Sequence, residues 1–351
     1  MKVLVIAIYL CILCLCQSSL GWSQHTDSLI SVSLLALGDV NLGRTVGQEI
    51  LKGNLDYPFE KFAGVLARAD VVFANLECPV TDQHGETQSP KSNVVFCAPP
   101  DAAKTLKRAG ITIVSTANNH AFDYGLKGLQ ETIKFLTQDS ILFAGTVSDS
   151  GLGFAPVIIE HHGITFGVLA YTQFVNIHGN WEGRIALFDS GKVCDEIHAL
   201  KPKVDFILVS YHGGDEYKEN PGISAERDME VLAAAGADVV FGHHSHVPQG
   251  IKIIQNCLVF HSLGNAVFNQ PQRFWTQRSF APLMEFKKRN GQKEISSIEL
   301  IPCRPGFQIQ ADVDEREARK VIGRIQSLST VTITHTERGY FVEPSVAQLS
   351  Y

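Results

Sequence analysis

The sequence predicts an α/β fold built on parallel strands, and three observations lead to this prediction. A helical segment, a Gly and a short β-branched run follow one another repeatedly, as in LKRAGITIVSTANNH (106–120) and LAAAGADVVFGHHSH (232–246). Helices commonly end at Gly, and buried parallel strands are continuous apolar runs. Each such run ends in polar residues. The chain of 351 residues, 45% hydrophobic and 19% charged, is long enough to bury a large core.

The first 23 residues are typical of a secretory signal peptide. Lys2 provides a positive start, residues 3–16 are apolar, and Ser19 and Gly21 are small residues of the kind found near a cleavage site. The apolar run is short for a membrane span. We therefore expect a secreted or cell-envelope protein, with an uncleaved N-terminal anchor as the alternative.

Five predicted strands run directly into clusters of Asp, Asn, Glu or His. They lie within residues 31–43, 66–77, 106–120, 201–216 and 232–246. Because sites in α/β sheets form beyond the carboxyl ends of the strands, we expect the five clusters to meet at one edge. Asn, Asp and Gly also form ordinary turns, which could explain any single cluster. Ordinary turns are a poor explanation for all five clusters together. Two further strands are expected at 164–172 and 257–268.

The pattern changes after residue 270. The segment LMEFKKRNGQKEISSIELIP alternates around Asn290 and Gly291, which is a strong hairpin signal. We expect this hairpin to belong to the same domain and to cover a second sheet. Residues 312–327 have helical spacing. The prediction is therefore one domain over residues 24–306 and a C-terminal helical cap or tail over residues 307–351.

Charge, motifs and cysteines exclude several classes of function. The formal net charge of −6 argues against a protein that coats nucleic acid. The sequence contains no G-x-S-x-G elbow, no phosphate-binding G-x-x-x-x-G-K-S/T loop and no G-x-G-x-x-G motif. Beyond the leader, five scattered cysteines form no C-x-x-C pair, so we expect buried free thiols rather than a disulfide framework or a zinc–thiolate site.

The polar clusters have the composition of a hydrolytic metal site. Such sites combine carboxylate oxygens with imidazoles and commonly hold two ions. On an extended segment the rings of His244 and His246 would point to one side and reach one ion, whereas His243 would face the other way and pack behind the ligands. The mixed ligands suit Mn, Fe or Zn. We therefore predict one or two divalent ions as the cofactor.

The motifs GDVNLGR, NLECPVT, ANNHAFDYG, YHGGDEY, GHHSHVPQG and SLGNAVF occur in this order over residues 31–270. The sequence thereby resembles the CapA family of capsule and poly-γ-glutamate synthesis proteins, which is related to calcineurin-like metallophosphoesterases. The resemblance implies their four-layer α/β/β/α sandwich with a two-metal site.

The resemblance also assigns roles to residues of this chain. The implied metal ligands are Asp39, Glu77, Asn119, His212, His244 and His246. The implied catalytic acid is His120, and Asp123 follows it three residues later as the second catalytic candidate. Residues expected to bind substrate or to support the ligands are Asn41, Asn75, Asn118, Glu216, His243 and Asn265.

This chain departs from the phosphoesterase pattern at three motifs. It has Asp39-Val40-Asn41 where the phosphoesterases have D-x-H, and Asn75-Leu76-Glu77 where they have GDxxD. It also has Ala266 and Asn269 where the last motif has Phe and Asp. These departures leave the number of ions and the reaction open.

We therefore expect an exported CapA-like protein that acts in synthesis or export of an anionic polymer such as poly-γ-glutamate, with a metal-dependent hydrolase site and membrane synthesis or export proteins as partners. One alternative is a generic secreted metallophosphoesterase. The other is a non-catalytic module that binds the polymer or a partner protein.

Overall fold

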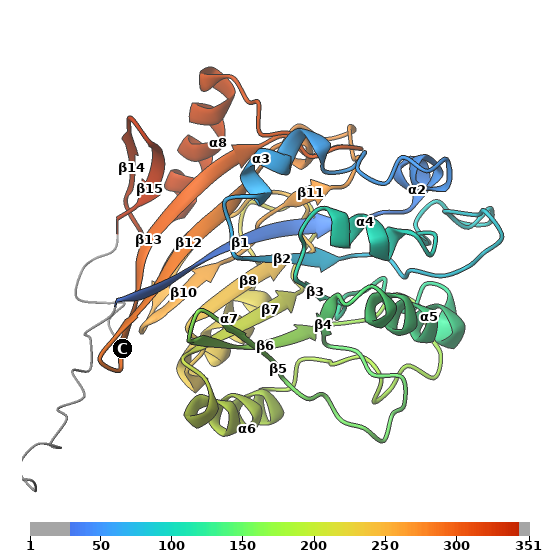
Figure 1. Cartoon of the computed structure of the whole chain (residues 1–351), viewed down its shortest axis with the longest axis horizontal. Coiled ribbons are helices and arrows are strands. Elements are labelled where there is room, and N and C mark those ends of the chain that lie inside the picture. Colours follow the sequence, from blue (N-terminus) through green and yellow to red (C-terminus); the bar gives the residue numbers. More distant parts are fainter. Residues whose placement is uncertain (1–28, 344–351) are drawn as a thin grey trace, which may run out of the picture.

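Two β-sheets stacked face to face form the centre of the protein (Figure 1). The computed structural model describes residues 29–343, so the predicted signal peptide and the last eight residues lie outside the described part. The nine-stranded sheet has the order β14-β15-β13-β12-β1-β2-β3-β4, with β11 also paired to β1. The six-stranded sheet has the order β5-β6-β7-β8-β10-β9.

The strands of the larger sheet are β1 (Ile30–Val40), β2 (Val71–Leu76), β3 (Ile113–Ser115), β4 (Leu142–Ala144), β11 (Asn265–Val267), β12 (Ser279–Arg289), β13 (Gln292–Cys303), β14 (Ile333–Thr336) and β15 (Gly339–Val342). Those of the smaller sheet are β5 (Val157–His161), β6 (Ile164–Thr172), β7 (Phe206–His212), β8 (Val239–His243), β9 (Ile251–Ile254) and β10 (Cys257–Phe260). The helices are α2 (Arg44–Leu51), α3 (Ala63–Leu66), α4 (Ala102–Arg108), α5 (Gly125–Gln138), α6 (Ser190–Leu200), α7 (Ile223–Ala235) and α8 (Glu315–Leu328), with short 3-10 turns at Glu60–Phe62, Lys201–Lys203 and Trp275–Gln277.

Alternation along the strands assigns each side chain to one of three apolar layers. In β1, Leu34 and Ala36 belong to the core between the sheets, whereas Leu35 and Leu37 belong to the core under α2, α3, α4 and α5. A third core joins the outer face of the smaller sheet to α6 and α7. Between the sheets, Phe73 stacks on Phe241 at a ring-centroid distance of 5.2 Å. The fold is therefore the four-layer α/β/β/α sandwich that the resemblance implies.

The predicted hairpin is confirmed, and so is its packing on a second sheet. Asn290 and Gly291 form its turn with φ values of 52° and 80°, the left-handed conformation that tight hairpin turns require. β12 pairs antiparallel with β1, from Ile30 opposite Lys288 to Leu35 opposite Leu283. The hairpin therefore extends the same sheet as β1. It also covers the smaller sheet, as expected, because Phe286 packs on Phe166 of β6 at 5.0 Å between ring centroids.

The C-terminal segment contains the expected helix and two strands that the sequence analysis did not predict. In α8, Val321 and Ile325 are buried in the core between the sheets. β14 and β15 form a hairpin that pairs with β13, so they continue the larger sheet. Residues 307–343 are thus built into the sandwich and are more than a peripheral helical cap, since their apolar side chains complete its core.

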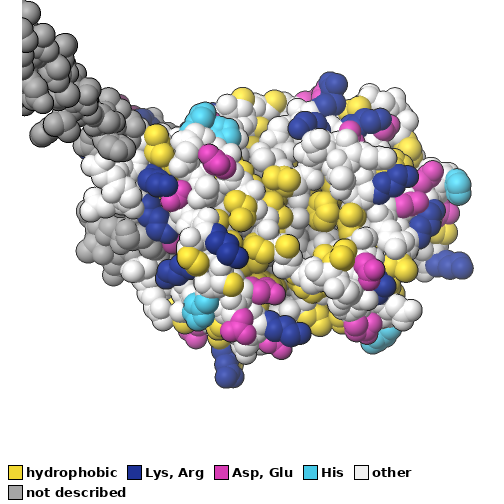
Figure 2. All heavy atoms as spheres, turned by 60° about the horizontal axis from the view of Figure 1, so that its bottom comes forward, with side chains coloured by type: hydrophobic (Ala, Val, Ile, Leu, Met, Phe, Trp, Pro, Cys, Tyr) yellow, Lys and Arg dark blue, Asp and Glu magenta, His cyan; other side chains and the backbone are white. Residues whose placement is uncertain are grey.

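The surface charges are mixed, and the cysteines are unpaired, as the composition predicts. Figure 2 shows charged side chains of both signs scattered over one face, with apolar surface between them. Within residues 29–343 the five cysteines are free, and four of them are buried. No helix in this part of the chain combines the length and apolarity that a membrane crossing demands.

Candidate metal centre

Five of the predicted ligands meet where the two sheets present the carboxyl ends of their strands. Asp39 lies near the end of β1, and Glu77 directly follows β2. His212 ends β7 in the other sheet, while His244 and His246 follow β8. All five side chains are buried. Parallel pairing of β1 with β2 and of β7 with β8 places these strand ends side by side.

The side chains form two groups that share Glu77. One group is Asp39, Glu77 and His246, and the other is Glu77, His212 and His244; within each, one ligand atom per residue lies within 4.8 Å of the others. The Nδ1 atom of His246 is 3.1 Å from Asp39 Oδ2, and its Nε2 atom is 3.8 Å from Glu77 Oε1. His212 Nε2 lies 3.7 Å from the same Glu77 oxygen. The shared carboxylate is the arrangement that a two-ion site uses.

Glu77 is the most unusual residue of the cluster. Its side chain is completely buried, and neither carboxylate oxygen has a hydrogen-bond partner. Burial, followed by the nearby charges of Asp39, Glu216 and Asp123, raises the pKa of Glu77 well above its ordinary value. Buried carboxylates are normally paired or bound to a metal. Glu77 therefore has the environment of a metal-binding carboxylate.

Two imidazoles beside Glu77, those of His212 and His244, are held in the neutral form. Burial is the largest cause, and the neighbouring His244 adds to it, so the pKa of His212 lies well below its ordinary value. Burial and the charge of His246 lower the pKa of His244 to about 3. A neutral imidazole with a free ring nitrogen is the form that binds metal ions, and His244 Nδ1 has no partner.

Asp39 is held from behind by two of the predicted supporting residues. Asn75 donates from Nδ2 to Asp39 Oδ1 at 2.9 Å, and His243 Nδ1 lies 3.3 Å from that oxygen. Burial alone would raise the pKa of Asp39, but hydrogen bonds from His243 and His246 hold it well below the ordinary value. Asp39 is therefore an ionised carboxylate in a fixed orientation.

The turn that carries His244 and His246 differs from the expectation. β8 ends at His243, and both residues adopt left-handed backbone conformations with φ values of 86° and 58°. The prediction of an extended H-x-H segment was wrong, although the two rings still lie on one side, with centroids 6.1 Å apart. A non-Gly residue with positive φ stores strain, which a function at that position can justify.

His120 and Asp123 form a hydrogen-bonded pair beside the cluster. His120 Nδ1 donates to Asp123 Oδ2 at 2.8 Å, and the same oxygen accepts the backbone N–H of Phe96 at 2.8 Å. His120 Nε2 is therefore turned toward Glu77, 4.0 Å from its Oε1 atom. A carboxylate that fixes an imidazole tautomer in this way is typical of a proton-transfer site.

The predicted asparagines support the cluster in different ways. Asn119 Oδ1 accepts from His212 Nε2 at 2.7 Å, so the two predicted ligand atoms lie together. Asn118 donates to the carbonyl of Leu76 at 2.8 Å and accepts the N–H of His120 at 3.1 Å, which links two strand ends. Asn265 Oδ1 faces His246 Nδ1 at 3.0 Å.

Two predicted residues lie outside this cluster. Asn41 lines a separate cavity next to it, and Glu216 is exposed. Sequence analysis missed the aromatic walls: Phe96 packs on His120 at 4.5 Å between ring centroids, and Phe268 packs on His246 at 4.9 Å. Apolar residues inside polar motifs carry no local signal of a site, so spacing alone could not identify them.

The residues present fit a divalent metal ion. Two buried carboxylates and three imidazoles offer the mixed oxygen and nitrogen donors that such ions bind. The unpartnered oxygens of Glu77 show that the cluster is not satisfied by internal hydrogen bonds.

Comparisons with known proteins agree with the motifs. Residues 33–270 match the family described as bacterial capsule synthesis protein PGA_cap. Capsule biosynthesis protein CapA of Bacillus anthracis is 27% identical over 310 residues, which cover 84% of this chain and 74% of that protein. PGA biosynthesis protein CapA of Bacillus subtilis (strain 168) is 27% identical over 291 residues, covering 80% and 74%.

The structural comparison finds the protein TT1561 of Thermus thermophilus with a TM-score of 0.41 and 11% identity, covering 74% of this chain and 99% of that one. A likeness at this level has no bearing on function. The family match, in contrast, includes every motif from β1 to the end of β11. The chain therefore belongs to the bacterial capsule synthesis protein family PGA_cap.

Proposed function

We propose that this chain is an exported protein of capsule or poly-γ-glutamate synthesis, and that its buried cluster is a divalent-metal hydrolase site acting on the anionic polymer or a precursor. Family membership and the two CapA relatives support the pathway. The observation that carries the hydrolase site is Glu77, whose two buried oxygens lack partners amid three imidazoles and a second carboxylate.

The ion or ions would be held by the two groups that share Glu77. Asp39 and His246 would complete one group, and His212 and His244 the other. Asn119 would add its amide oxygen, which now accepts a hydrogen bond from His212. When bound, divalent ions of the Mn, Fe or Zn type supply Lewis-acid polarisation of the scissile bond and lower the pKa of water.

The proton-transfer role belongs to His120. Asp123 fixes the proton on Nδ1, which leaves Nε2 facing the cluster. From this position Nε2 can hold a proton and deliver it to the oxygen or nitrogen of a leaving group. Phe96 covers one face of the ring and excludes water from it.

The first experiment is elemental analysis of the chain from residue 24 after loading with Mn, Fe and Zn. The His244→Ala/His246→Ala variant should lose the ions that the wild-type chain retains. The matched control is His84→Ala/His198→Ala, which removes two exposed imidazoles that belong to no candidate metal group of the described residues. Unchanged metal content in the first variant contradicts the metal site.

A loaded protein should then be screened on a chromogenic phosphodiester and on γ-glutamyl oligomers. Turnover of either substrate that disappears when the metal is removed supports a hydrolase and identifies the bond that is cleaved. Polymer binding without turnover would instead favour the non-catalytic module.

Export is tested separately by N-terminal sequencing of the mature protein. The chain should begin near residue 24, and an intact N-terminus would mean a retained anchor.

A further inference from the structure

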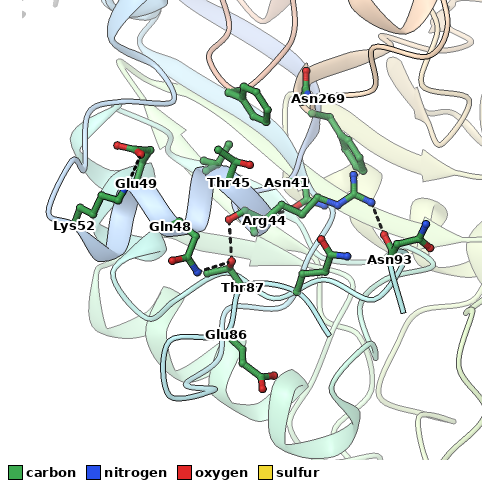
Figure 3. A pocket seen from close by; sticks show the side chains of 15 residues that line it. Asn41, Arg44, Thr45, Gln48, Glu49, Lys52, Glu86, Thr87, Asn93 and Asn269 are labelled. Carbon is green, nitrogen blue, oxygen red and sulfur yellow. Dashed lines mark hydrogen bonds and ion pairs between the residues drawn. The ribbon is translucent and has the colours of Figure 1, made fainter. Parts of the chain in front are cut away.

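A polar cavity of about 610 Å³ adjoins the cluster at the start of α2. Its wall includes Asn41, Arg44, Thr87, Asn93 and Phe268. Figure 3 shows Arg44 extending across the cavity, with its guanidinium group between Asn93 and Asn269. The proposed hydrolase chemistry uses none of these side chains.

Arg44 has more hydrogen-bond donors than partners. One Nη2–H donates to the carbonyl of Asn93 at 2.5 Å, whereas Nε is buried and has no partner. A guanidinium group carries five N–H donors in a planar fork. No carboxylate among residues 29–343 forms an ion pair with Arg44. Burial lowers its pKa from the ordinary value, yet arginine stays charged.

Asn41, which also lines this cavity, carries a second unsatisfied donor. Its side chain is 4% exposed, and its Oδ1 atom accepts the N–H of Gly43 at 2.9 Å. Because Oδ1 is the acceptor of that hydrogen bond, the remaining polar atom of the amide is Nδ2, and Nδ2 has no partner. Two residues of one cavity wall, one of them charged, therefore have unsatisfied donors, and an oxyanion is the group that would satisfy both.

The position of Arg44 relates this cavity to the cluster. Its guanidinium carbon lies 4.4 Å from the ring centroid of Phe96 and 5.9 Å from that of Phe268. Phe96 in turn packs on His120, and Phe268 packs on His246. Arg44 is thus one aromatic ring away from two histidines of the site, and the rings fix its orientation through cation–π contact.

The acidic residues of the cavity do not oppose an anion at Arg44. Glu49 is paired with Lys52 at 2.7 Å, and Glu86 is exposed. In Figure 3 both carboxylates lie away from the guanidinium group.

We propose that Arg44 and Asn41 form an oxyanion subsite that binds a carboxylate or phosphoryl group of the substrate next to the bond at the cluster. The term substrate here rests on the proposed function, whereas anion binding does not. Arg44 would position the chain of an anionic polymer, and Asn41 would add one hydrogen bond.

The test measures binding of a γ-glutamyl oligomer and of inorganic phosphate by calorimetry, on metal-loaded wild type and on Arg44→Gln. We expect the variant to bind the anion weaker by about 10- to 100-fold, the effect of losing hydrogen bonds to a charged group. If Arg44→Gln mainly loses affinity for the oligomer, the subsite binds a carboxylate. If it mainly loses affinity for phosphate, the subsite binds a phosphoryl group. An oligomer with amidated carboxyl groups should bind weakly and be indifferent to the substitution.

The matched control is Arg338→Gln, which removes an exposed guanidinium that also faces a phenylalanine ring, that of Phe341 at 5.6 Å. It should bind both probes like the wild type. Arg44→Lys keeps the charge but not the fork and should lose only part of the affinity, which also covers the case in which Arg44→Gln folds poorly. Equal binding of both probes by wild type, Arg44→Gln and Arg44→Lys overturns the proposal.

The two proposals fail in different measurements. Elemental analysis of Arg44→Gln should give the wild-type metal content, since no ligand is changed. Loss of binding with metal retained supports the subsite even if no substrate is ever turned over. If His244→Ala/His246→Ala leaves the metal content unchanged while anion binding still depends on Arg44, the metal site is refuted. The oxyanion subsite is then still supported.

Discussion

Replacing Glu77 by Gln tests the cluster most sharply, because the substitution removes a charge with little change of shape. Glu77 belongs to both groups of candidate ligands, so its loss affects every ion that they hold. The ion-free and the loaded protein should respond in opposite directions, which a merely structural residue would not do.

The magnitudes follow from burial and mass action. In the ion-free chain the carboxylate is completely buried without a partner, and burial of an unpaired charge costs several kcal/mol after relaxation. Glu77→Gln should therefore be at least as stable as the wild type. With metal at about 100 times its Kd, the wild type should gain about 2.7 kcal/mol per site. The variant should gain almost nothing.

The assay is urea denaturation of both proteins, with a chelator and with Mn added. Glu294→Gln, which changes an exposed glutamate of β13, is the control and should follow the wild type under both conditions. A Glu77→Gln variant that is stabilised by Mn as strongly as the wild type would refute the assignment of this carboxylate as a shared ligand.

The remaining predictions concern catalysis, pH and packing. His120→Ala should retain the metal and lose about 100- to 10,000-fold in turnover; a parallel loss of metal in elemental analysis would make His120 a ligand instead. Asp238 is buried, and burial raises its pKa from 3.8 to about 6. The folded state therefore holds this proton more tightly than the unfolded state, so the contribution to stability is present below pH 4 and is lost as the pH rises through 6. Asp238→Asn, which can still accept the N–H of Ile207, should gain about 3 kcal/mol relative to the wild type between pH 4 and pH 8 in denaturation curves; a pH-independent difference would contradict this. A Cβ atom on Gly38 would lie 1.8 Å from the carbonyl oxygen of Gly264, so Gly38→Ala should destabilise the protein by about 1–3 kcal/mol in urea, and an unchanged midpoint would contradict the close packing of β1 on this loop.

Local patterns predicted the strands that carry the cluster. The runs before Asp39, Glu77 and His212 are mostly apolar, and each leads into the residue that faces the site. The rule that parallel strands present their carboxyl ends together was enough to bring these residues to one place. The family motifs added the sandwich and the assignment of roles.

What the sequence did not predict depends on contacts between distant segments. No local pattern shows that β12 pairs with β1, or that β15 pairs with β13, because pairing partners are chosen by the whole sheet. The left-handed turn at His244 and His246 is stabilised by its surroundings against the preference of histidine. The stacking of Arg44 on Phe96 joins a motif residue to a loop residue far from it in the chain.

The use of both sheets by one cluster has a consequence for folding. Asn75 and His212, which touch within it, are 137 positions apart in the sequence. An ion bound there would cross-link two layers that are otherwise held by side-chain packing, and it would close a loop of more than a hundred residues. Its binding energy would then count as folding energy. The supply of metal would then determine how strongly the two layers are held together.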